Sequence, residues 1–202
     1  MSIKVENITK LYGKQKALNQ VSFEINTGDV VGFLGPNGAG KSTIMKILTG
    51  FIPPTSGDAW INGNNVLEKS LKVRNDIGYL PESNPLYPDM YVREYLRFVA
   101  GLYKLGKDTR NRVAEMIDIT GLAKEQHKKI GALSKGYRQR VGLAQAMIHD
   151  PDVLILDEPT SGLDPNQIVE IRNLIGEIGK EKTVMLSTHI MQEVEAICDK
   201  II

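Results

Sequence analysis

A glycine-rich stretch behind an apolar run holds the residue types that point most directly to chemistry. Residues Gly35 to Ser42 read GPNGAGKS, which fits the pattern GxxxxGK[ST], and they follow the apolar residues Val30 to Leu34. Glycines let successive backbone N–H groups turn toward phosphate oxygens, and a helix N-terminus adds partial positive charge. We therefore predict a phosphate loop before a helix over Thr43 to Leu48. Lys41 should reach the outer phosphates, and Ser42 should offer its hydroxyl to Mg²⁺. The loop alone does not separate a kinase from a GTPase or an ATPase.

Two adjacent carboxylates follow a second apolar run. Asp157 and Glu158 come directly after Val153 to Leu156, so we expect both at the end of a buried strand. Because side chains alternate along a strand, the two should point in different directions. Asp157 can then face a metal ion, while Glu158 leans toward an attacking water.

The chain has three histidines, and their sequence contexts differ. His127 lies in the charged run 124–129 and His149 at a predicted helix end, so we expect both to be solvated. His189 follows a predicted strand over Thr183 to Ser187, at the sheet edge where parallel sheets place ligands. His189 is therefore the histidine expected in the site.

A second helix N-terminus has the composition of an anion site. The stretch Leu133 to Tyr137 reads LSKGY, in which Ser134 can cap the following helix and Gly136 permits close backbone approach. Arg138 and Arg140 follow, where acidic residues would ordinarily be favoured. This terminus should be unusually positive, although a structural cap beside a solvated basic face would also explain it.

The elements that must position these residues follow from the apolar pattern. Val21, Phe23 and Ile25 alternate with polar residues, which predicts a half-buried strand that ends in a turn at 26–29. Continuous apolar runs predict parallel strands covered on both faces, at 30–34, 153–156 and 184–186. Helical spacing predicts helices at 91–103, 109–120 and 137–149, with Val141, Ala144 and Ile148 in one stripe. The middle of the chain should therefore be a helical insert.

Composition narrows the class of protein. The 202 residues suit one domain or a core with a small lobe, and 25 basic against 24 acidic residues leave a net charge of +1. No broad positive field exists to attract nucleic acid. Cys198 is the only cysteine, which excludes an internal disulfide framework, and no apolar run is long enough to span a bilayer. An apolar run that starts at Ile201 suggests that the chain is truncated at its C-terminus.

Taken in order, these motifs resemble the ATP-binding subunit of an ABC transporter over essentially the whole chain. The motifs that carry the resemblance are Gly35 to Thr43, Leu133 to Tyr137, Val153 to Glu158, Ser161 to Asp164, and His189. The resemblance implies an α/β fold, with a P-loop NTPase (RecA-like) core, an antiparallel β region and an inserted helical subdomain. The whole of 1–202 would be one ABC domain, with the core and β region at 1–82 and 151–202 and the helical subdomain at about 83–150.

The same resemblance implies a role for each residue of the motifs. Glu158, His189 and Lys41 would be catalytic, and Ser42, Glu82 and Asp157 would hold Mg²⁺. ATP would bind to Gly35, Pro36, Asn37, Gly38, Ala39, Gly40, Lys41, Ser42 and Thr43, with Tyr12 stacked on the adenine. Ser134 and Gly136 would contact the γ-phosphate of ATP held by another subunit.

Three residues depart from the commonest pattern of the family. The segment Leu133 to Tyr137 corresponds to the signature segment of the family, which usually reads Leu-Ser-Gly-Gly-Gln. Lys135 and Tyr137 replace a glycine and the glutamine of that signature. Glu82 stands where a glutamine usually links Mg²⁺ to the membrane subunit. Glu82 is expected close to Asp157 and Glu158, so that three acids cluster around a cation. These departures resemble the ABC-2 exporter branch, and LSKGYRQRVGLAQAMIHDP is especially similar to gliding-motility-associated ATP-binding subunits.

The partners implied are an integral membrane permease subunit and a second ATP-binding subunit, forming a homodimer with ATP sandwiched between the copies, without nucleic acid. The implied location is the cytoplasmic face of the membrane. A soluble ABC-type ATPase is an alternative, but such relatives generally need two cassettes or a long coiled-coil insertion, and neither fits in 202 residues. A nucleotide-dependent regulatory module is a further alternative, although a pure binder could dispense with Glu158.

Overall fold

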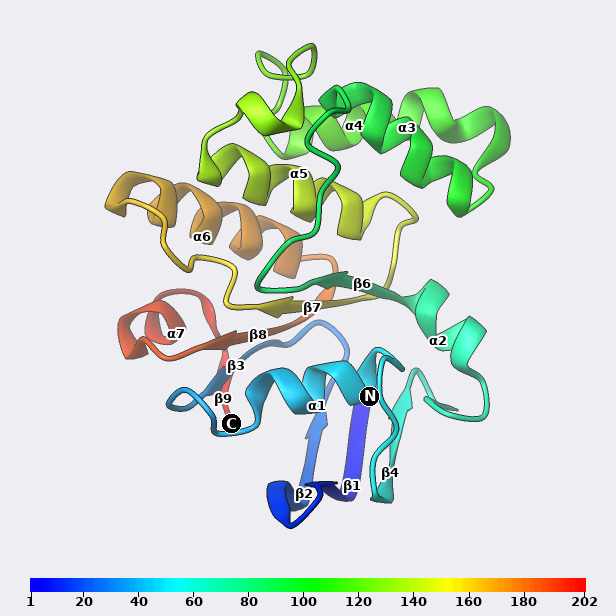
Figure 1. The fold of residues 1–202 in the computed structure, drawn as a ribbon, viewed down its shortest axis with the longest axis vertical. Helices are drawn as coiled ribbons and strands as arrows, with labels where there is room; N and C mark the ends of the chain where they lie inside the picture. The colour runs from blue at the N-terminus through cyan, green and yellow to red at the C-terminus, as the bar shows by residue number, and fades with distance from the viewer.

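Two sheets and two groups of helices make up the computed structural model, which describes all of residues 1–202 (Figure 1). The strands are β1 (Ile3–Tyr12), β2 (Gln15–Ile25), β3 (Val30–Leu34), β4 (Ser56–Ile61), β5 (Asn64–Asn65), β6 (Ile77–Leu80), β7 (Val153–Asp157), β8 (Thr183–Thr188) and β9 (Lys200–Ile201). The α-helices are α1 (Lys41–Leu48), α2 (Ser70–Asp76), α3 (Val92–Leu102), α4 (Thr109–Ile119), α5 (Lys135–Met147), α6 (Pro165–Gly179) and α7 (Met191–Ile197). Short 3₁₀ turns are η1 (Gly106–Asp108) and η2 (Ile130–Ala132).

The central sheet is parallel and five-stranded, in the order β6-β7-β8-β3-β9. Its strands are apolar without alternation because both faces are covered. Leu154 and Leu156 pack with the cluster formed by α3 to α6, whereas Val153 and Ile155 pack with α1 and the antiparallel strands. The prediction of parallel strands buried on both faces is confirmed.

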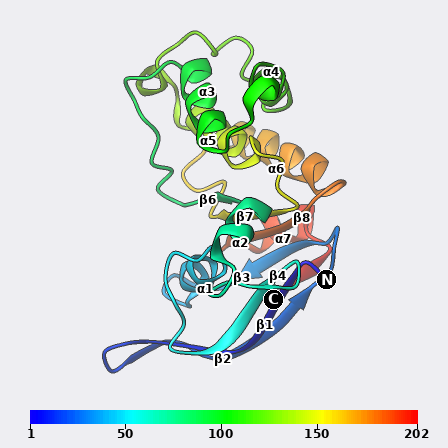
Figure 2. The same ribbon diagram turned by 90° about the vertical axis from the view of Figure 1, so that its right-hand side faces the viewer.

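The second sheet is antiparallel, in the order β2-β1-β4-β5, and covers the α1 side of the core (Figure 2). The predicted alternation appears in β2, where Val21 and Phe23 are half-buried, Ile25 is buried, and the polar residues between them are exposed. The antiparallel β region expected from the resemblance is confirmed.

Helices α3, α4 and α5 lie between β6 and β7 in the chain and form the layer farthest from the antiparallel sheet (Figures 1 and 2). Helix α5 begins at Lys135, two residues before the predicted start, because Ser134 caps it. It is buried well beyond the predicted stripe, since it packs between the central sheet and the outer helices. The α/β fold with an inserted helical region is therefore as predicted.

Candidate functional site

The phosphate loop joins β3 to α1 and bends at two glycines. Gly38 has φ 83° and Gly40, the N-cap of α1, has φ 95°, both in the left-handed region that favours glycine. A Cβ on Gly40 would also lie 2.6 Å from the carbonyl oxygen of Ala17. The loop conformation therefore depends on glycine at position 40.

A pocket of about 480 Å³ lies against this loop. Its lining residues come from the β1–β2 hairpin, the loop, α1 and the ends of two central strands: Tyr12, Gln15, Lys16, Ala17, Asn37, Gly38, Gly40, Lys41, Ser42, Thr43, Glu82 and Glu158. The fold thus gathers most of the residues predicted to bind the nucleotide. Gly35, Pro36 and Ala39 complete the loop without lining the pocket.

Lys41 connects the loop to the carboxylate of Glu158. Its Nζ donates to the carbonyl oxygens of Gly35 at 2.6 Å and Pro36 at 3.2 Å, and lies 3.5 Å from Glu158 Oε1. Only 6% of Lys41 is exposed. An ammonium held inside a loop of this kind can donate to phosphate oxygens in place of the carbonyls.

The two carboxylates differ in their surroundings, as the strand alternation predicts. Asp157 is buried and its Oδ1 accepts a hydrogen bond from Ser187 Oγ at 2.6 Å. The Glu158 backbone has φ 49°, a conformation that side-chain-bearing residues seldom adopt, and its N–H donates to the same Ser187 Oγ at 2.9 Å. One serine on β8 thus holds both residues at the end of β7.

The Glu158 carboxylate meets His189. His189 Nδ1 lies 3.1 Å from Oε1 and 3.0 Å from Oε2 of Glu158. With a proton on Nδ1 the imidazole donates to the carboxylate, which leaves Nε2 directed elsewhere. The side chain of His189 is 46% exposed, so it can also face a ligand. Lys41, Glu158 and His189 therefore form one connected group beside the phosphate loop.

A buried glutamate secures the segments that carry this group. Glu193 on α7 accepts hydrogen bonds from Thr160 Oγ1 and Thr188 Oγ1, both at 2.6 Å. The hydroxyl of Thr188 in turn accepts from the backbone N–H of Ile190 at 3.1 Å. These contacts tie the turn after Glu158 to the turn that carries His189.

The residues proposed for Mg²⁺ have the oxygen donors that this ion prefers. Ser42 and Glu82 line the pocket, and Asp157 Oδ2 accepts no hydrogen bond from the protein. The expected cluster of three acids is wrong, however, because no group of three acidic, histidine or cysteine side chains could hold a metal ion. Glu82 is exposed, whereas Asp157 is buried at the strand end. Any Mg²⁺ site must therefore be completed by other oxygens, as is usual when a nucleotide supplies them.

The pKa of Tyr79 on β6 is raised by burial and by the charge of Asp157 on the neighbouring strand. Burial, and secondly the charge of Asp157, raise the pKa of its phenol to about 12. The hydroxyl is buried without a hydrogen-bond partner. Tyr79 therefore stays protonated and contributes packing, including a tilted ring contact with Phe51 at 6.0 Å.

The signature segment lies outside the pocket. Ser134 Oγ accepts from the Tyr137 N–H at 3.4 Å, and Gly136 is buried where a Cβ would lie 2.7 Å from the side chain of Gln167. The predicted positive terminus is partly wrong. Arg138 folds back to donate to Leu133 O at 2.8 Å. Arg140 lies in the second turn of α5 and pairs with Glu170 at 2.6 Å.

Of the two histidines expected to be solvated, only His127 is exposed. His149 stacks on Tyr103 with ring centroids 3.8 Å apart, and its Nε2 lies 3.0 Å from Ile77 O. The prediction for His149 is wrong because the end of α5 packs against α3 and β6. Ser187 and Glu193 were not predicted, since their importance arises from strand register and from a contact with α7.

Comparison with known proteins places this geometry in a family. The sequence profile described as ABC transporter matches residues 18–161. The chain belongs to the ABC transporter family. The profile spans the phosphate loop, the signature segment and both carboxylates.

Curated relatives of this ABC chain align with nearly all of it. The bacitracin transport ATP-binding protein BcrA of Bacillus licheniformis is 40% identical over 201 residues, which cover 98% of this chain and 65% of the relative. The uncharacterized ABC transporter ATP-binding protein MJ1023 of Methanocaldococcus jannaschii is 40% identical over 205 residues, covering 99% of this chain and 72% of that protein. The chain spans only 65% or 66% of the length of the three relatives BcrA, YxlF and LnrL.

Solved ABC cassettes share the fold. The dimeric cassette MJ0796 superposes with a TM-score of 0.86 at 29% identity, over 96% of this chain and 90% of that one. The cbiO1 subunit of Clostridium perfringens gives a TM-score of 0.87 at 34% identity, over 98% and 82%. A further structure of MJ0796, in a post-hydrolysis state, holds ADP and Pi. The predicted fold class is confirmed, whereas the finer resemblance to gliding-motility subunits stays a prediction.

Proposed function

We propose that this chain binds Mg-ATP and hydrolyses it to power an ABC transporter. The observation that carries the proposal is the contact group of Lys41, Glu158 and His189 at the mouth of the phosphate loop. Lys41 is placed for the outer phosphates, and Glu158 is placed to orient or deprotonate a water. His189 steadies Glu158 and faces the same space.

In this proposal the phosphate loop and Thr43 hold the ATP phosphates, and Tyr12, which is 51% exposed at the pocket, stacks on adenine. Ser42, Asp157 and Glu82 hold Mg²⁺, which when bound neutralises charge on the phosphate oxygens. Lys41 and His189 then stabilise the charge that develops on the transferred phosphoryl group while Glu158 acts on the water.

Two copies are proposed to close on ATP. Ser134 and Gly136 do not line the pocket of their own chain, so they can reach a γ-phosphate only from a partner. Support comes from MJ0796, a cassette of the same fold that is described as dimeric. The core and β region at 1–82 and 151–202 would hold the ATP, and the helical subdomain at about 83–150 would present Ser134 to the partner.

The membrane partner is proposed to be an integral permease subunit, with this chain at the cytoplasmic face. Relatives such as BcrA are named for transport, which favours this role over a soluble ABC-type ATPase or a regulatory module. None of the helices has both the length and the apolar character needed to cross a bilayer. Copurification with an integral membrane protein would separate a transporter subunit from the alternatives.

Glu158→Gln tests the enzymatic part. The substitution keeps size and hydrogen bonding but removes the base, so ATP hydrolysis should fall by about two to four orders of magnitude. Binding of ATP, followed with a fluorescent analogue, should persist. Glu181→Gln removes an exposed carboxylate in the turn after α6 and should leave turnover unchanged. Near-normal turnover in Glu158→Gln would refute the role of Glu158.

A further inference from the structure

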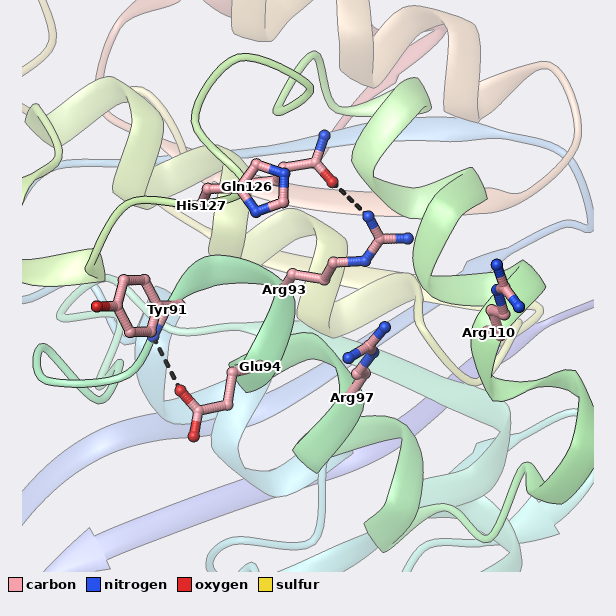
Figure 3. A pocket seen from close by; sticks show the side chains of 7 residues that line it. All are labelled: Tyr91, Arg93, Glu94, Arg97, Arg110, Gln126 and His127. Atoms are coloured by element: carbon pink, nitrogen blue, oxygen red, sulfur yellow. Dashed lines mark hydrogen bonds between the residues drawn. The ribbon is translucent and has the colours of Figure 1, made fainter.

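A basic pocket of about 710 Å³ lies in the outer helical layer, away from the phosphate loop. Arg93 and Arg97 contribute to it from α3, and Arg110 from the start of α4. Figure 3 shows these side chains beside one open space between the two helices, with Gln126 and His127 on the neighbouring segment. None of these residues lines the pocket at the phosphate loop.

The guanidinium of Arg93 is held in place by the protein. Its Nη1 donates to Gln126 Oε1 at 2.7 Å, and Gln126 Nε2 donates to Ala123 O at 2.8 Å. The segment that carries Gln126 is itself fixed to α3, because the Arg93 N–H donates to Gln126 O at 3.1 Å. Arg93 Nε is buried without a hydrogen-bond partner. Arg93 Nη2 donates to no protein atom and is not among the buried unpaired atoms, so this end of the fixed guanidinium is available to a ligand.

None of the three arginines takes part in an ion pair, and their charge is only partly offset by the other lining side chains. Of the ten ion pairs in the molecule, none includes Arg93, Arg97 or Arg110. Glu94 is the only carboxylate among the lining residues, and it accepts from the Tyr91 N–H at the start of α3. With His127 neutral, the lining side chains sum to a charge of +2.

Helix position adds to this imbalance. Arg93 and Arg110 are each the second residue of an 11-residue helix. Cations are unfavourable in the first turn, where the helix dipole is positive, whereas an anion bound there is favourable. An anion between the two helix starts would therefore interact well with both termini and with the guanidinium groups.

We propose that this pocket is a second anion site, which binds the phosphate group of a phosphorylated compound. A phosphate monoester carries a charge of about −1.5 to −2 at pH 7, which matches the +2 of the pocket, and its oxygens match the fork geometry of arginine. The phosphate can belong to a soluble compound or to a lipid headgroup. The site does not depend on ATP turnover at the phosphate loop.

Pyrophosphate, titrated into the full chain, is the first probe. The Nε–H signals of Arg93, Arg97 and Arg110 in ¹H–¹⁵N spectra should shift and saturate together, a readout that binding at the phosphate loop does not mimic. In Arg97→Gln/Arg110→Gln the affinity read from the Arg93 signal should fall at least about tenfold. Lys69→Gln/Lys72→Gln, which removes two exposed charges from the region of α2, should leave it unchanged. Arg110→Lys keeps the charge but loses the fork, and should bind with intermediate affinity.

Two results would overturn the proposal. One is the absence of saturable shifts at these three arginines up to about 10 mM pyrophosphate, a range that detects millimolar binding. The other is equal affinity for succinate, which would show a general dianion site without preference for phosphate.

Vesicles identify the source of the phosphate. Cosedimentation with phosphatidylcholine vesicles containing phosphatidate, lost in Arg97→Gln/Arg110→Gln, would support a lipid headgroup. Pyrophosphate binding without cosedimentation would support a soluble phosphorylated compound.

Discussion

Ser187 offers a direct test of how the fold holds its two carboxylates. The residue is fully buried in β8, opposite Asp157 in the parallel register. Its hydroxyl donates to Asp157 Oδ1 at 2.6 Å and accepts from the Glu158 N–H at 2.9 Å. Ser187→Ala removes both hydrogen bonds and leaves a buried carboxylate oxygen and a buried N–H unpaired.

The magnitude follows from these two bonds. A hydrogen bond to a charged group contributes about 1.5 to 3 kcal/mol and a neutral one about 0.5 to 1.5 kcal/mol. Ser187→Ala should therefore lower the free energy of unfolding by about 2 to 4.5 kcal/mol. Turnover should also fall by about tenfold or more, because the strained backbone of Glu158 loses the bond that orients it.

Urea unfolding and a steady-state ATPase assay would measure the two effects. Ser56→Ala, at an exposed position in β4, is the control and should change the free energy of unfolding by less than about 0.5 kcal/mol. If the free energy of unfolding of Ser187→Ala also differed from wild type by less than about 0.5 kcal/mol, Ser187 would not be the residue that holds Asp157 and Glu158.

Two further predictions concern groups outside the Lys41, Glu158 and His189 contacts. Burial is the main cause that lowers the pKa of His149 below its ordinary 6.5. The unfolded chain therefore binds the proton more readily than the folded chain. The free energy of unfolding should fall as the pH drops below about 6.5, and this group should not affect it at higher pH. In thermal melts, His149→Phe should show a smaller loss of stability at low pH, whereas the control His127→Gln should show the same loss as wild type. An unchanged loss in His149→Phe would contradict the role of His149. Tyr79→Phe removes a buried hydroxyl that has no partner, and urea unfolding should show no loss, or a gain of up to about 1 kcal/mol. A loss of more than about 1 kcal/mol would mean that the hydroxyl is bonded in solution.

The parts of the site that could be predicted are those formed by residues close together in the sequence. The phosphate loop, the Asp157-Glu158 pair and the cap at Ser134 each combine residue types whose chemistry depends on immediate neighbours. The central strands were equally clear, because a continuous apolar run predicts a strand covered on both faces.

The remainder depends on contacts between distant segments. Ser187 matters because strand register sets it opposite Asp157. Glu193 matters because α7 brings its carboxylate within hydrogen-bond distance of two threonine hydroxyls. His149 was expected in solvent but stacks on Tyr103, which is 46 positions earlier in the chain. Arg140 was expected to add positive charge to the start of α5, yet Glu170 on α6 pairs with it. No local pattern encodes these pairings.

The most direct test of the central claim asks whether one ATP site is built from two chains. Lys41→Ala and Ser134→Arg should each inactivate the homodimer, the first by removing charge from the phosphates and the second by blocking the opposing cap. In a mixed dimer, one site combines Lys41 of the Ser134→Arg chain with Ser134 of the Lys41→Ala chain, and that site is intact. With random pairing and independent sites, mixing should restore about a quarter of the wild-type sites. Chain exchange is verified with tagged subunits, and a dimer of wild type with Lys41→Ala shows whether one site suffices for ATPase activity. Recovery of activity on mixing is the predicted result; an inactive mixture, with exchange proven and the wild type–Lys41→Ala dimer active, would contradict a shared site.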